Sequence, residues 1–376
     1  MKLRIDQKQL ADAARRAFRR LPTNPLQPVL GGLLLETDGD SVTLSGFDYE
    51  TSTRAALAAD VLEPGHVLVS GRLLADVTAA MPAGPVDVVV DGQELALTAP
   101  GTSFTLPTMP RSEYPELPKP PAAAGTVNGD GLAAAVVHAA GVVMPDKEAT
   151  GNLEGFRGVH LASAGDKLMV SASDRYRIVR HTLPWQPDGD TSGDLLIPGA
   201  DFAATARDLA EQKVRVSFTG PGGGVAALAG DTLTVTGRTV AAPFPDIDGF
   251  FPEPAKAVGW MRVDSAELLD AVKRAALVND KDVLPVTLTF DRGHVTVSGG
   301  SEGSAGASRV DVEAADLDGF TAGYRPGFLG SLLAPIDGLV QVWFTTPKRP
   351  VLIQPVDDDG AATATYRAVC MPVRLK

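Results

Sequence analysis

The sequence repeats one pattern three times, and this repeat constrains the fold more than any other feature. Each copy has a short extended segment, an Asp or Asn, and then a run with helical apolar spacing: RIDQKQLADAARRA from Arg4, TVNGDGLAAAVVHAA from Thr126 and RVDSAELLDAVKRAA from Arg262. Asp and Asn favour helix N-caps because their side-chain oxygens accept hydrogen bonds from the free amides of the first turn. We therefore predict helices that begin after Asp6, Asn128 and Asp264.

Two further features follow each predicted helix in the same order. The first is a pair of alternating apolar runs around a Gly-containing turn, which predicts β-hairpins at 31–50, 157–176 and 285–300. Asp48 and Asp174 occupy matching positions after the first two hairpins. The second feature is another helix, predicted at 71–81, 199–211 and 326–336, with strand-like runs after it. Because the copies lie about 120–140 residues apart, each one is a domain and not one turn of a solenoid.

The pattern predicts an α+β fold class with three repeated domains, each made of two helices and antiparallel sheets. The expected domains are 1–120, 124–254 and 258–376, the last with a C-terminal tail, and proline-rich linkers separate them. Domains rich in strands must cover their sheet edges. Sheets joined between neighbouring domains would do so, and an end-to-end array of such domains tends to close into a ring.

Composition limits the kind of protein. The 376 residues carry 34 basic and 46 acidic side chains, a net charge of −12, which argues against phosphate-driven binding over the whole surface but allows a locally basic lining. A single cysteine, Cys370, excludes a disulfide framework. No run approaches the ~18 apolar residues of a membrane helix, and the N-terminus lacks a signal-peptide core. We expect a soluble cytoplasmic protein with no membrane association.

No pattern for catalysis or metal binding emerges. The five histidines (His66, His138, His160, His181 and His294) are scattered, with no paired metal-ligand spacing, so surface or core positions are expected. The sequence also lacks a complete phosphate-binding loop and a nucleophile elbow. We expect a protein that is not an enzyme and that needs no cofactor or metal.

Several motifs resemble a known family, the bacterial DNA polymerase III beta subunit, or sliding clamp, and leave open a divergent paralogue of actinobacterial type. They are MKLRI at the start, LPTNPLQPVLGGLLLE at 21–36, SDRYRI at 173–178, PFPDI at 243–247 and MPVRL at 371–375. The resemblance covers the whole chain. It implies three similar domains per subunit and a head-to-tail homodimeric ring of six domains around double-stranded DNA, with helices lining the hole.

The resemblance also implies a cleft between the second and third domains that takes short peptides. Its partners would be the replicative polymerase alpha subunit, the clamp loader, repair polymerases and other proteins with a clamp-binding motif, and cyclic or linear peptide inhibitors. The matching positions are Phe156, Arg157, Ser173, Arg175, Tyr176, Arg177, Ile178, Pro245, Ile247, Val283, Arg325, Phe328, Lys348, Pro350, Val369, Met371, Pro372, Val373, Arg374 and Leu375. Such aliphatic, Met and Arg side chains suit an adaptable apolar pocket with donors for peptide carbonyls.

DNA contacts and a dimer seam are expected elsewhere in the chain. On the first helix Leu10, Ala14 and Phe18 form an apolar line, and the arginines fall off it. Those arginines fit either a solvated helix face or DNA contact. The candidate DNA-binding residues are Arg19, Arg20, Asn24, Arg72, Lys147, Arg207 and Lys273. The expected dimer contacts set Phe104 and Leu106 against Leu277 and Val278.

Some residues depart from the family pattern. Asn24 stands where the family often has an arginine, and Arg325 where it usually has an asparagine. PKRP at 347–350 adds charge to the same rim, and Glu302 is the only acid in a segment that commonly has several. These departures keep a second function open: a paralogous clamp with an altered cleft, acting as a decoy or as a resistance copy against clamp-binding inhibitors.

Overall fold

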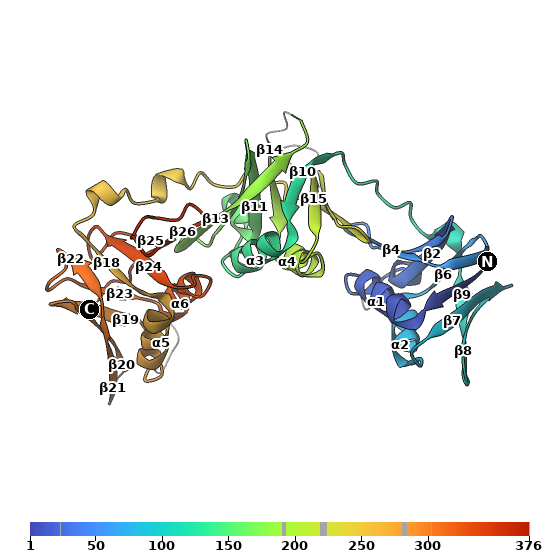
Figure 1. Cartoon of the computed structure of the whole chain (residues 1–376), viewed down its shortest axis with the longest axis horizontal. Helices are drawn as coiled ribbons and strands as arrows, with labels where there is room; N and C mark the ends of the chain where they lie inside the picture. The colour runs from blue at the N-terminus through green and yellow to red at the C-terminus, as the bar shows by residue number, and fades with distance from the viewer. Residues whose placement is uncertain (23, 190–192, 219–223, 280–283, 302, 376) are drawn as a thin grey trace. The chain divides into compact units, whose positions relative to one another are not determined.

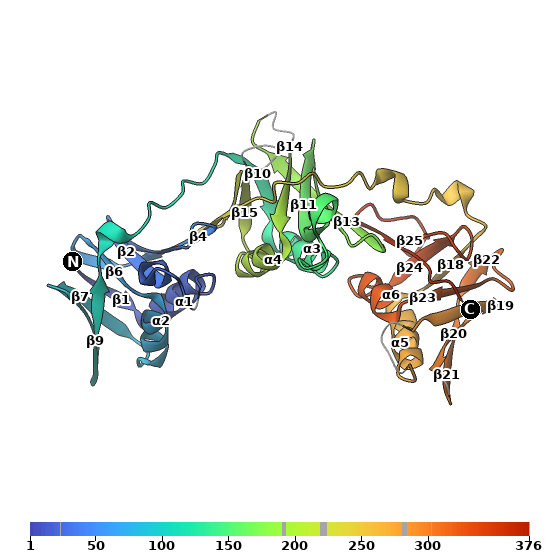
Figure 2. The same ribbon diagram turned by 180° about the vertical axis from the view of Figure 1, so that it is seen from behind.

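The structure is a computed structural model that describes residues 1–376 except 23, 190–192, 219–223, 280–283, 302 and 376 (Figures 1 and 2). Contacts divide the chain into two compact units. Unit 1 comprises residues 1–133, 186–191 and 201–241, and unit 2 comprises residues 134–185, 192–200 and 242–376. Each unit has its own antiparallel sheets.

The helices begin where the repeat predicts. Each predicted cap accepts a hydrogen bond of 3.1 Å from an amide in the first turn: Asp6 from Gln9, Asn128 from Gly131 and Asp264 from Glu267. The α-helices are α1 (Gln7–Phe18), α2 (Gly71–Ala80), α3 (Gly129–Ala140), α4 (Gly199–Asp208), α5 (Ser265–Ala276) and α6 (Pro326–Leu333).

The second helix of each copy ends one to three residues before its predicted end. Met81 is extended because a residue before proline, here Pro82, is disfavoured in helical geometry. Pro335 follows α6 closely and prevents its extension. Short 3-10 turns lie at η1 (Pro28–Gly31), η2 (Arg111–Glu113), η3 (Gly151–Arg157), η4 (Asp248–Phe250) and η5 (Pro254–Lys256).

Unit 1 contains two sheets that share β9. Sheet A has the order β5–β1–β7–β8–β9, and sheet B has the order β9–β6–β2–β3–β4–β17–β16–β15–β10. The strands are β1 (Lys2–Asp6), β2 (Gly32–Asp38), β3 (Ser41–Phe47), β4 (Thr51–Ala58), β5 (Asp60–Glu63), β6 (His66–Ser70), β7 (Pro85–Asp91), β8 (Glu94–Ala99), β9 (Thr102–Met109), β10 (Ala123–Asn128), β15 (Lys213–Phe218), β16 (Val225–Ala229) and β17 (Leu233–Arg238).

Unit 2 also contains two sheets. Sheet C has the order β14–β11–β12–β13–β26–β25–β24–β18–β22, and sheet D has the order β21–β20–β19–β23. The strands are β11 (Gly158–Ala164), β12 (Lys167–Ser173), β13 (Arg177–Pro187), β14 (Gly193–Pro198), β18 (Gly259–Asp264), β19 (Val286–Asp291), β20 (His294–Ser301), β21 (Ser304–Asp311), β22 (Glu313–Ala315), β23 (Thr321–Tyr324), β24 (Leu339–Phe344), β25 (Val351–Pro355) and β26 (Tyr366–Cys370).

The predicted hairpins are confirmed as β2–β3, β11–β12 and β19–β20. Each turn has a glycine with positive φ, at Gly39, Gly165 and Gly293. Glycine adopts this left-handed conformation without a Cβ clash, so the three copies use the same turn chemistry.

Two strand pairs join segments that are far apart in the sequence. β4 pairs with β17 inside unit 1, and β13 pairs with β26 inside unit 2. The prediction that sheets continue between repeats is therefore confirmed at both places. Each pairing covers a sheet edge that would otherwise be open to another chain.

Helix α1 packs against α2, and α5 packs against α6 (Figure 1). Leu10 and Ala14 are buried and Phe18 is half-buried, as the predicted apolar line requires. Among the described residues, no helix has the length and apolarity to cross a membrane.

Candidate functional site

The turn between β12 and β13 is fixed by its own side chains. The Asp174 carboxylate accepts hydrogen bonds from the amides of Tyr176 (2.9 Å) and Arg177 (2.7 Å). The Ser173 hydroxyl donates to the Arg177 carbonyl at 2.8 Å and accepts from the Arg175 amide. Arg175 has φ of 76°, a left-handed conformation that is uncommon for a non-glycine residue. The turn leaves the Tyr176 ring half exposed.

Arg177 lies under this turn and is buried. Its guanidinium pairs with the Asp174 carboxylate at 2.8 Å and donates to the Ser331 hydroxyl of α6 at 2.7 Å. The same group stacks 4.4 Å from the centre of the Phe328 ring. Because a buried charge is stable only when it is paired and hydrogen-bonded, these contacts hold α6 and the turn together as one rigid floor.

Two aromatic rings lie on this floor, and Arg325 covers them. The Tyr176 and Phe328 ring centres are 6.0 Å apart. The Arg325 guanidinium lies 5.4 Å from the Tyr176 ring and 5.1 Å from the Phe328 ring. Cations attract aromatic faces at such distances, so Arg325 occupies the surface that an incoming apolar side chain would use.

An apolar wall adjoins the rings. Ile178, Ile247 and Val369 are buried together, with Phe244 and Phe251 packed against them.

The tail continues from this wall. The Met371 amide donates to the Tyr176 carbonyl at 2.9 Å, and the Val373 amide donates to the Gly323 carbonyl at 2.8 Å. Met371 and Leu375 are large apolar residues that remain exposed. Exposed apolar side chains beside a buried wall are typical of a binding surface.

The remaining predicted cleft residues are placed around these. Pro245, Pro372 and Phe156 are half-buried, and Arg374 is exposed. Arg157 is also exposed and lies 4.0 Å from Asp146. Val283 and Glu302 lie outside the described residues.

The 347–350 rim lies at the end of the same strands. Val351 pairs with Cys370, which sets Pro350 beside Met371. Pro350 also lines a cavity of about 580 Å³ with Phe250 and Phe251, and Lys348 is exposed.

Sequence reasoning missed three parts of this site. The roles of Asp174 and Ser331 were not predicted, although Asp48 and Asp174 stood at matching positions and Ser331 is polar in an otherwise apolar helix. The histidines were predicted to be surface or core residues without metal-ligand spacing, and the contact between two of them was not predicted. His138 Nδ1 and His181 Nε2 lie 2.8 Å apart, and His138 Nε2 lies 2.9 Å from the Ser331 carbonyl oxygen.

Both histidines of this pair are half-buried. Burial lowers the pKa of His138, and burial with the neighbouring His138 lowers the pKa of His181 to about 3. His138 donates to the Ser331 carbonyl, which leaves its Nδ1 to accept from His181. The pair is therefore neutral at pH 7 and joins α3 to α6 without charge.

The candidate DNA-binding arginines of α1 are already paired. Arg19 and Arg20 lie 3.0 and 3.3 Å from the Asp208 carboxylate of α4. The Arg20 side chain is 5% exposed, whereas that of Arg19 is 37% exposed. This placement favours Arg19 over Arg20 for contact with a phosphate.

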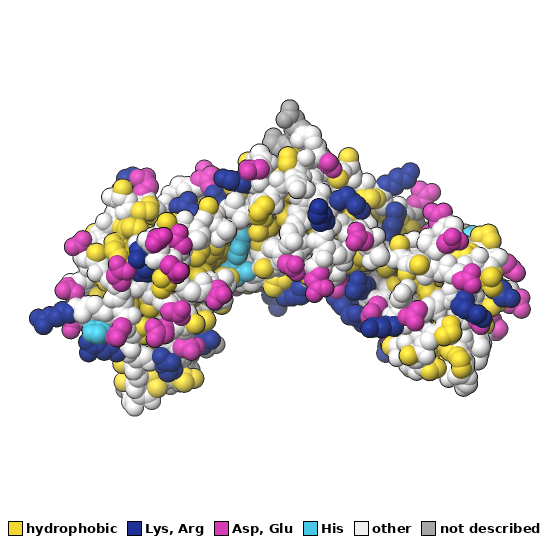
Figure 3. Space-filling model, viewed as in Figure 1, with side chains coloured by type: hydrophobic (Ala, Val, Ile, Leu, Met, Phe, Trp, Pro, Cys, Tyr) yellow, Lys and Arg dark blue, Asp and Glu magenta, His cyan; other side chains and the backbone are white. Residues whose placement is uncertain are grey.

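The other candidate DNA-binding residues are Asn24, Arg72, Lys147, Arg207 and Lys273, and all are exposed. Arg72 lies 3.7 Å from Asp76, and Lys273 lies 3.6 Å from Asp270. On the face shown in Figure 3, acidic and basic side chains are interspersed. Such a surface offers scattered cations for weak contacts that ignore DNA sequence.

The predicted dimer residues differ in exposure. Leu277 is 83% exposed, and Phe104 and Val278 are half-buried. Leu106 is 1% exposed and packs inside unit 1, so its side chain is not available to a second copy in this arrangement.

Among the described residues, no group of three or more His, Cys, Asp or Glu side chains could hold a metal ion. Cys370 is fully buried, and burial raises the pKa of its thiol to about 12. A thiol with such a pKa is a poor nucleophile.

Comparison with known proteins gives consistent matches. Residues 1–118 match the family model of the DNA polymerase III beta subunit, N-terminal domain. The chain is 36% identical to the beta sliding clamp of Streptomyces coelicolor and 32% identical to the beta sliding clamp homolog GriR of Streptomyces muensis, with 100% of both chains covered in each case. A solved DnaN sliding clamp from Pseudomonas aeruginosa, bound to griselimycin, matches with a TM-score of 0.90 at 21% identity and full coverage of both chains.

Proposed function

Since the chain belongs to the beta sliding clamp family of bacterial DNA polymerase III, we propose that it is a processivity factor of DNA replication. Two copies associate head to tail in a ring around duplex DNA, without recognising its sequence. The domain boundaries follow the repeat, at 1–120, 124–254 and 258–376. The ring works in the cytoplasm, has no catalytic role of its own and needs no cofactor.

A tether of this kind acts through effective concentration. A polymerase held on the ring stays near the primer end although its own contacts with DNA are unchanged. The net charge of −12 supports this function, because a ring that gripped the phosphates tightly would slide poorly.

The candidate cleft is the proposed docking place for the replicative polymerase, the clamp loader and repair polymerases. The observation that carries this proposal is the half-exposed Tyr176 ring, paired with the half-buried Phe328 ring beside the buried wall that ends at Met371. An extended peptide would set apolar side chains against the rings and wall, while nearby arginines bind its carbonyls or carboxylates.

Deletion of 371–376 tests the cleft. Binding of a fluorescent peptide copied from the clamp-binding segment of the host's polymerase should fall at least tenfold, because the exposed side of the wall is lost. Light scattering of the variant should still give a mass near twice 39.1 kDa. Unchanged peptide affinity in the deleted protein would reject the cleft assignment.

Loading onto circular DNA tests the ring itself. The clamp loaded on nicked circles should stay bound in high salt and be released when the circle is cut, because a topological link does not depend on charge. Equal retention on circular and linear DNA would contradict encirclement.

A second function, a paralogue with an altered cleft, is favoured by Arg325. The guanidinium covers both rings, and one full-length relative is a clamp homolog, GriR. In this function the chain resists or sequesters cyclic or linear peptide inhibitors of the ordinary clamp. Substitution Arg325→Asn should then raise inhibitor affinity about tenfold, and equal affinity of the wild type and the variant would reject this function.

A further inference from the structure

The turn after β3 in unit 1 repeats the hydrogen bonds of the turn after β12 in unit 2. The Asp48 carboxylate accepts from the amides of Glu50 (3.0 Å) and Thr51 (2.7 Å), as Asp174 does in the second turn. Tyr49 has φ of 75°, and its counterpart Arg175 has φ of 76°. Such a conformation in a non-glycine residue is costly and is found most often at functional sites.

The strand register repeats as well. Thr51 pairs with Gly237 in unit 1, and Arg177 pairs with Cys370 in unit 2. One residue further, the Arg238 amide donates to the Glu50 carbonyl at 3.1 Å, as the Met371 amide does to the Tyr176 carbonyl.

Even the linkers are held alike. The Arg54 guanidinium donates to the Pro118 carbonyl at 3.1 Å, and its counterpart Arg180 pairs with Asp248 at 2.6 Å. The backbone of the turn and strand pair beside the unit 2 cleft is therefore matched in unit 1, although the wall residues Ile178 and Val369 have Ser52 and Thr236 as their counterparts.

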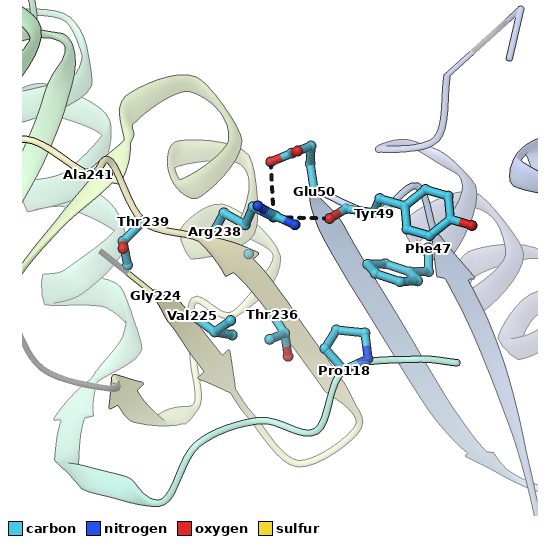
Figure 4. A pocket seen from close by; sticks show the side chains of 11 residues that line it. Phe47, Tyr49, Glu50, Pro118, Gly224, Val225, Thr236, Arg238, Thr239 and Ala241 are labelled. Carbon is cyan, nitrogen blue, oxygen red and sulfur yellow. Dashed lines mark hydrogen bonds and ion pairs between the residues drawn. The ribbon is translucent and has the colours of Figure 1, made fainter. Parts of the chain in front are cut away.

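A hollow lies beside this turn and strand pair in unit 1. A cavity of about 350 Å³ is lined by Phe47, Tyr49, Pro118, Val225 and Thr239 among others (Figure 4). The Tyr49 ring is 48% exposed and lies 5.6 Å from the ring of Phe47. The volume is at the lower end of the roughly 300–1,000 Å³ of ligand pockets, so it fits one or two side chains of a peptide.

One polar atom in this cavity has no partner. Thr239 Oγ1 is buried and makes no hydrogen bond within the described part of the chain. Arg238, by contrast, is engaged: its Nε donates to the Tyr49 carbonyl at 3.3 Å and lies 3.6 Å from the Glu50 carboxylate (Figure 4). Because neighbouring atoms shield this hydroxyl, the backbone of a ligand bonds with it only when they move aside.

The two places differ in charge. The positions of Arg175 and Arg374 in the unit 2 cleft correspond to Tyr49 and Ala241 in unit 1, neither of which is charged. The cation and anion of the unit 1 cavity, Arg238 and Glu50, pair with each other. An uncharged ligand therefore complements this cavity, whereas the unit 2 cleft favours a ligand with a carboxylate.

We propose that the unit 1 cavity is a second peptide-binding site, specific for a short extended segment with one aromatic or aliphatic anchor and uncharged neighbours. The anchor packs between Tyr49, Pro118 and Val225, and the backbone of the segment bonds with the Thr239 hydroxyl. The inference rests on the proposed function of the clamp, since it takes the same class of partner segment.

Photo-crosslinking tests the site directly. The probe is acetyl-Ser-Leu-(p-benzoylphenylalanine)-amide, the competitor is acetyl-Ser-Leu-Phe-amide, and mass spectrometry maps the adducts on the full-length protein. Competable adducts are expected in 47–50 or 224–241. They should fall at least tenfold in Tyr49→Gly, which removes the ring while glycine accepts the positive φ, and about threefold in the near-isosteric Thr239→Val.

The matched variant Arg175→Gly is the control, and it should leave the unit 1 adducts unchanged. A probe with Glu in place of Ser should label unit 1 less. Absence of competable adducts in unit 1, or adducts indifferent to Tyr49→Gly, would overturn the inference whether or not unit 2 is labelled. Labelling in unit 1 with none in unit 2 would support the inference and count against the proposed cleft, so the two failures are distinct.

Discussion

The β4–β17 and β13–β26 junctions share one backbone design but differ in what they bury. Both have an Asp-capped turn with a left-handed residue and the same strand register. Three residues after the capping Asp, however, unit 1 has Thr51 and unit 2 has the buried Arg177.

A strand pair four residues further along differs in the same way. Buried Ala55 faces Leu233 in unit 1, whereas half-buried His181 faces Tyr366 in unit 2. The comparison teaches that the repeat supplies the scaffold, and that at these positions only the unit 2 junction has ionisable side chains, which must be partnered where they are buried.

The largest effect should come from the capping aspartates. Asp174→Ala removes the partner of a buried guanidinium, so the free energy of unfolding of unit 2 should fall by roughly 3–5 kcal/mol. Asp48→Ala at the matched position removes only two amide hydrogen bonds, so unit 1 should lose about 1–2 kcal/mol. Urea unfolding, followed by hydrogen exchange in each unit, measures both. Equal losses would mean that the ion pair adds nothing to the shared turn.

The helix contacts give a second contrast, because unit 1 joins α1 to α4 by charge and unit 2 joins α3 to α6 by neutral histidine. Burial lowers the pKa of Arg20, and the Asp208 carboxylate opposes that effect. Asp208→Asn leaves Arg20 without an anion and should destabilise unit 1 by about 2 kcal/mol.

The salt dependence of amide protection tests this second contrast between the units. Added salt should weaken protection of α1 amides slightly in the wild type and not in Asp208→Asn, because salt screens the part-exposed Arg19–Asp208 pair but hardly reaches the buried Arg20–Asp208 pair. The matched control Asp76→Asn removes an exposed pair on α2 and should change protection by less than about 0.5 kcal/mol. Loss of α1 protection equal to that control would contradict the assigned role of Asp208.

Lowering the pH should destabilise unit 2 and not unit 1, by less than the substitutions above. The pKa of His181 is lowered to about 3 by burial, so between this value and the ordinary value of 6.5 the unfolded chain binds a proton that the folded chain does not. Stability of unit 2 is therefore complete above about pH 6.5 and is lost as pH falls. From pH 7 to 5 the loss should be about 1–2 kcal/mol.

His181→Ala, which copies Ala55 of unit 1, should reduce the pH dependence of unit 2, and the remainder comes from His138 and His160, whose pKa values burial also lowers. His66→Ala, at an exposed position, should leave it unchanged. Thermal unfolding between pH 5 and 7 measures all three proteins, and a dependence equally steep in His181→Ala would exclude the histidine pair as its source.

The smallest effect is expected at the exposed rim of the unit 1 cavity. Glu50 and Arg238 are 3.6 Å apart, with side chains 68% and 66% exposed. Glu50→Gln should change unfolding by less than about 0.5 kcal/mol, because solvent screens such pairs. A loss above about 1 kcal/mol in the free energy of unfolding, measured by thermal melting, would show that the Glu50–Arg238 ion pair stabilises unit 1. Ion pairs would then stabilise both junctions, which would contradict the difference between them.

The sequence predicted most of the scaffold because local chemistry sets it. Caps such as Asp6 and Asp264 act within one helical turn, and the Gly39 and Gly165 turns act within one hairpin. Prediction failed where the partner lies far away in the chain. The His138–His181 pair depends on α3 packing beside β13, and Asp208 reaches Arg20 across 188 residues of sequence. No spacing rule links such positions.

The candidate site also has a part that the sequence predicted and a part that it did not. Tyr176, Phe328 and Met371 were found through motifs, and the structure brings them together. That Arg325 covers the rings could not be predicted, since a side chain's direction depends on the packing of α6. The burial of Leu106 was missed for a similar reason: strand alternation gives two faces, and only the tertiary fold decides which one is covered.

The order in which the chain is synthesised has a consequence for the strand pairs β4–β17 and β13–β26. About 175 residues separate the end of β4 from the start of β17, and a similar length separates β13 from β26. The ribosome adds about 5–20 residues per second, so each early strand waits roughly ten to forty seconds for its partner strand to be synthesised. During that wait β4 and β13 are open edges on a nascent chain. Arg54 and Arg180 lie in these strands, and a charge on an open edge discourages pairing with a neighbouring chain. The arginines that later hold the linkers would thus disfavour aggregation of the unfinished chain.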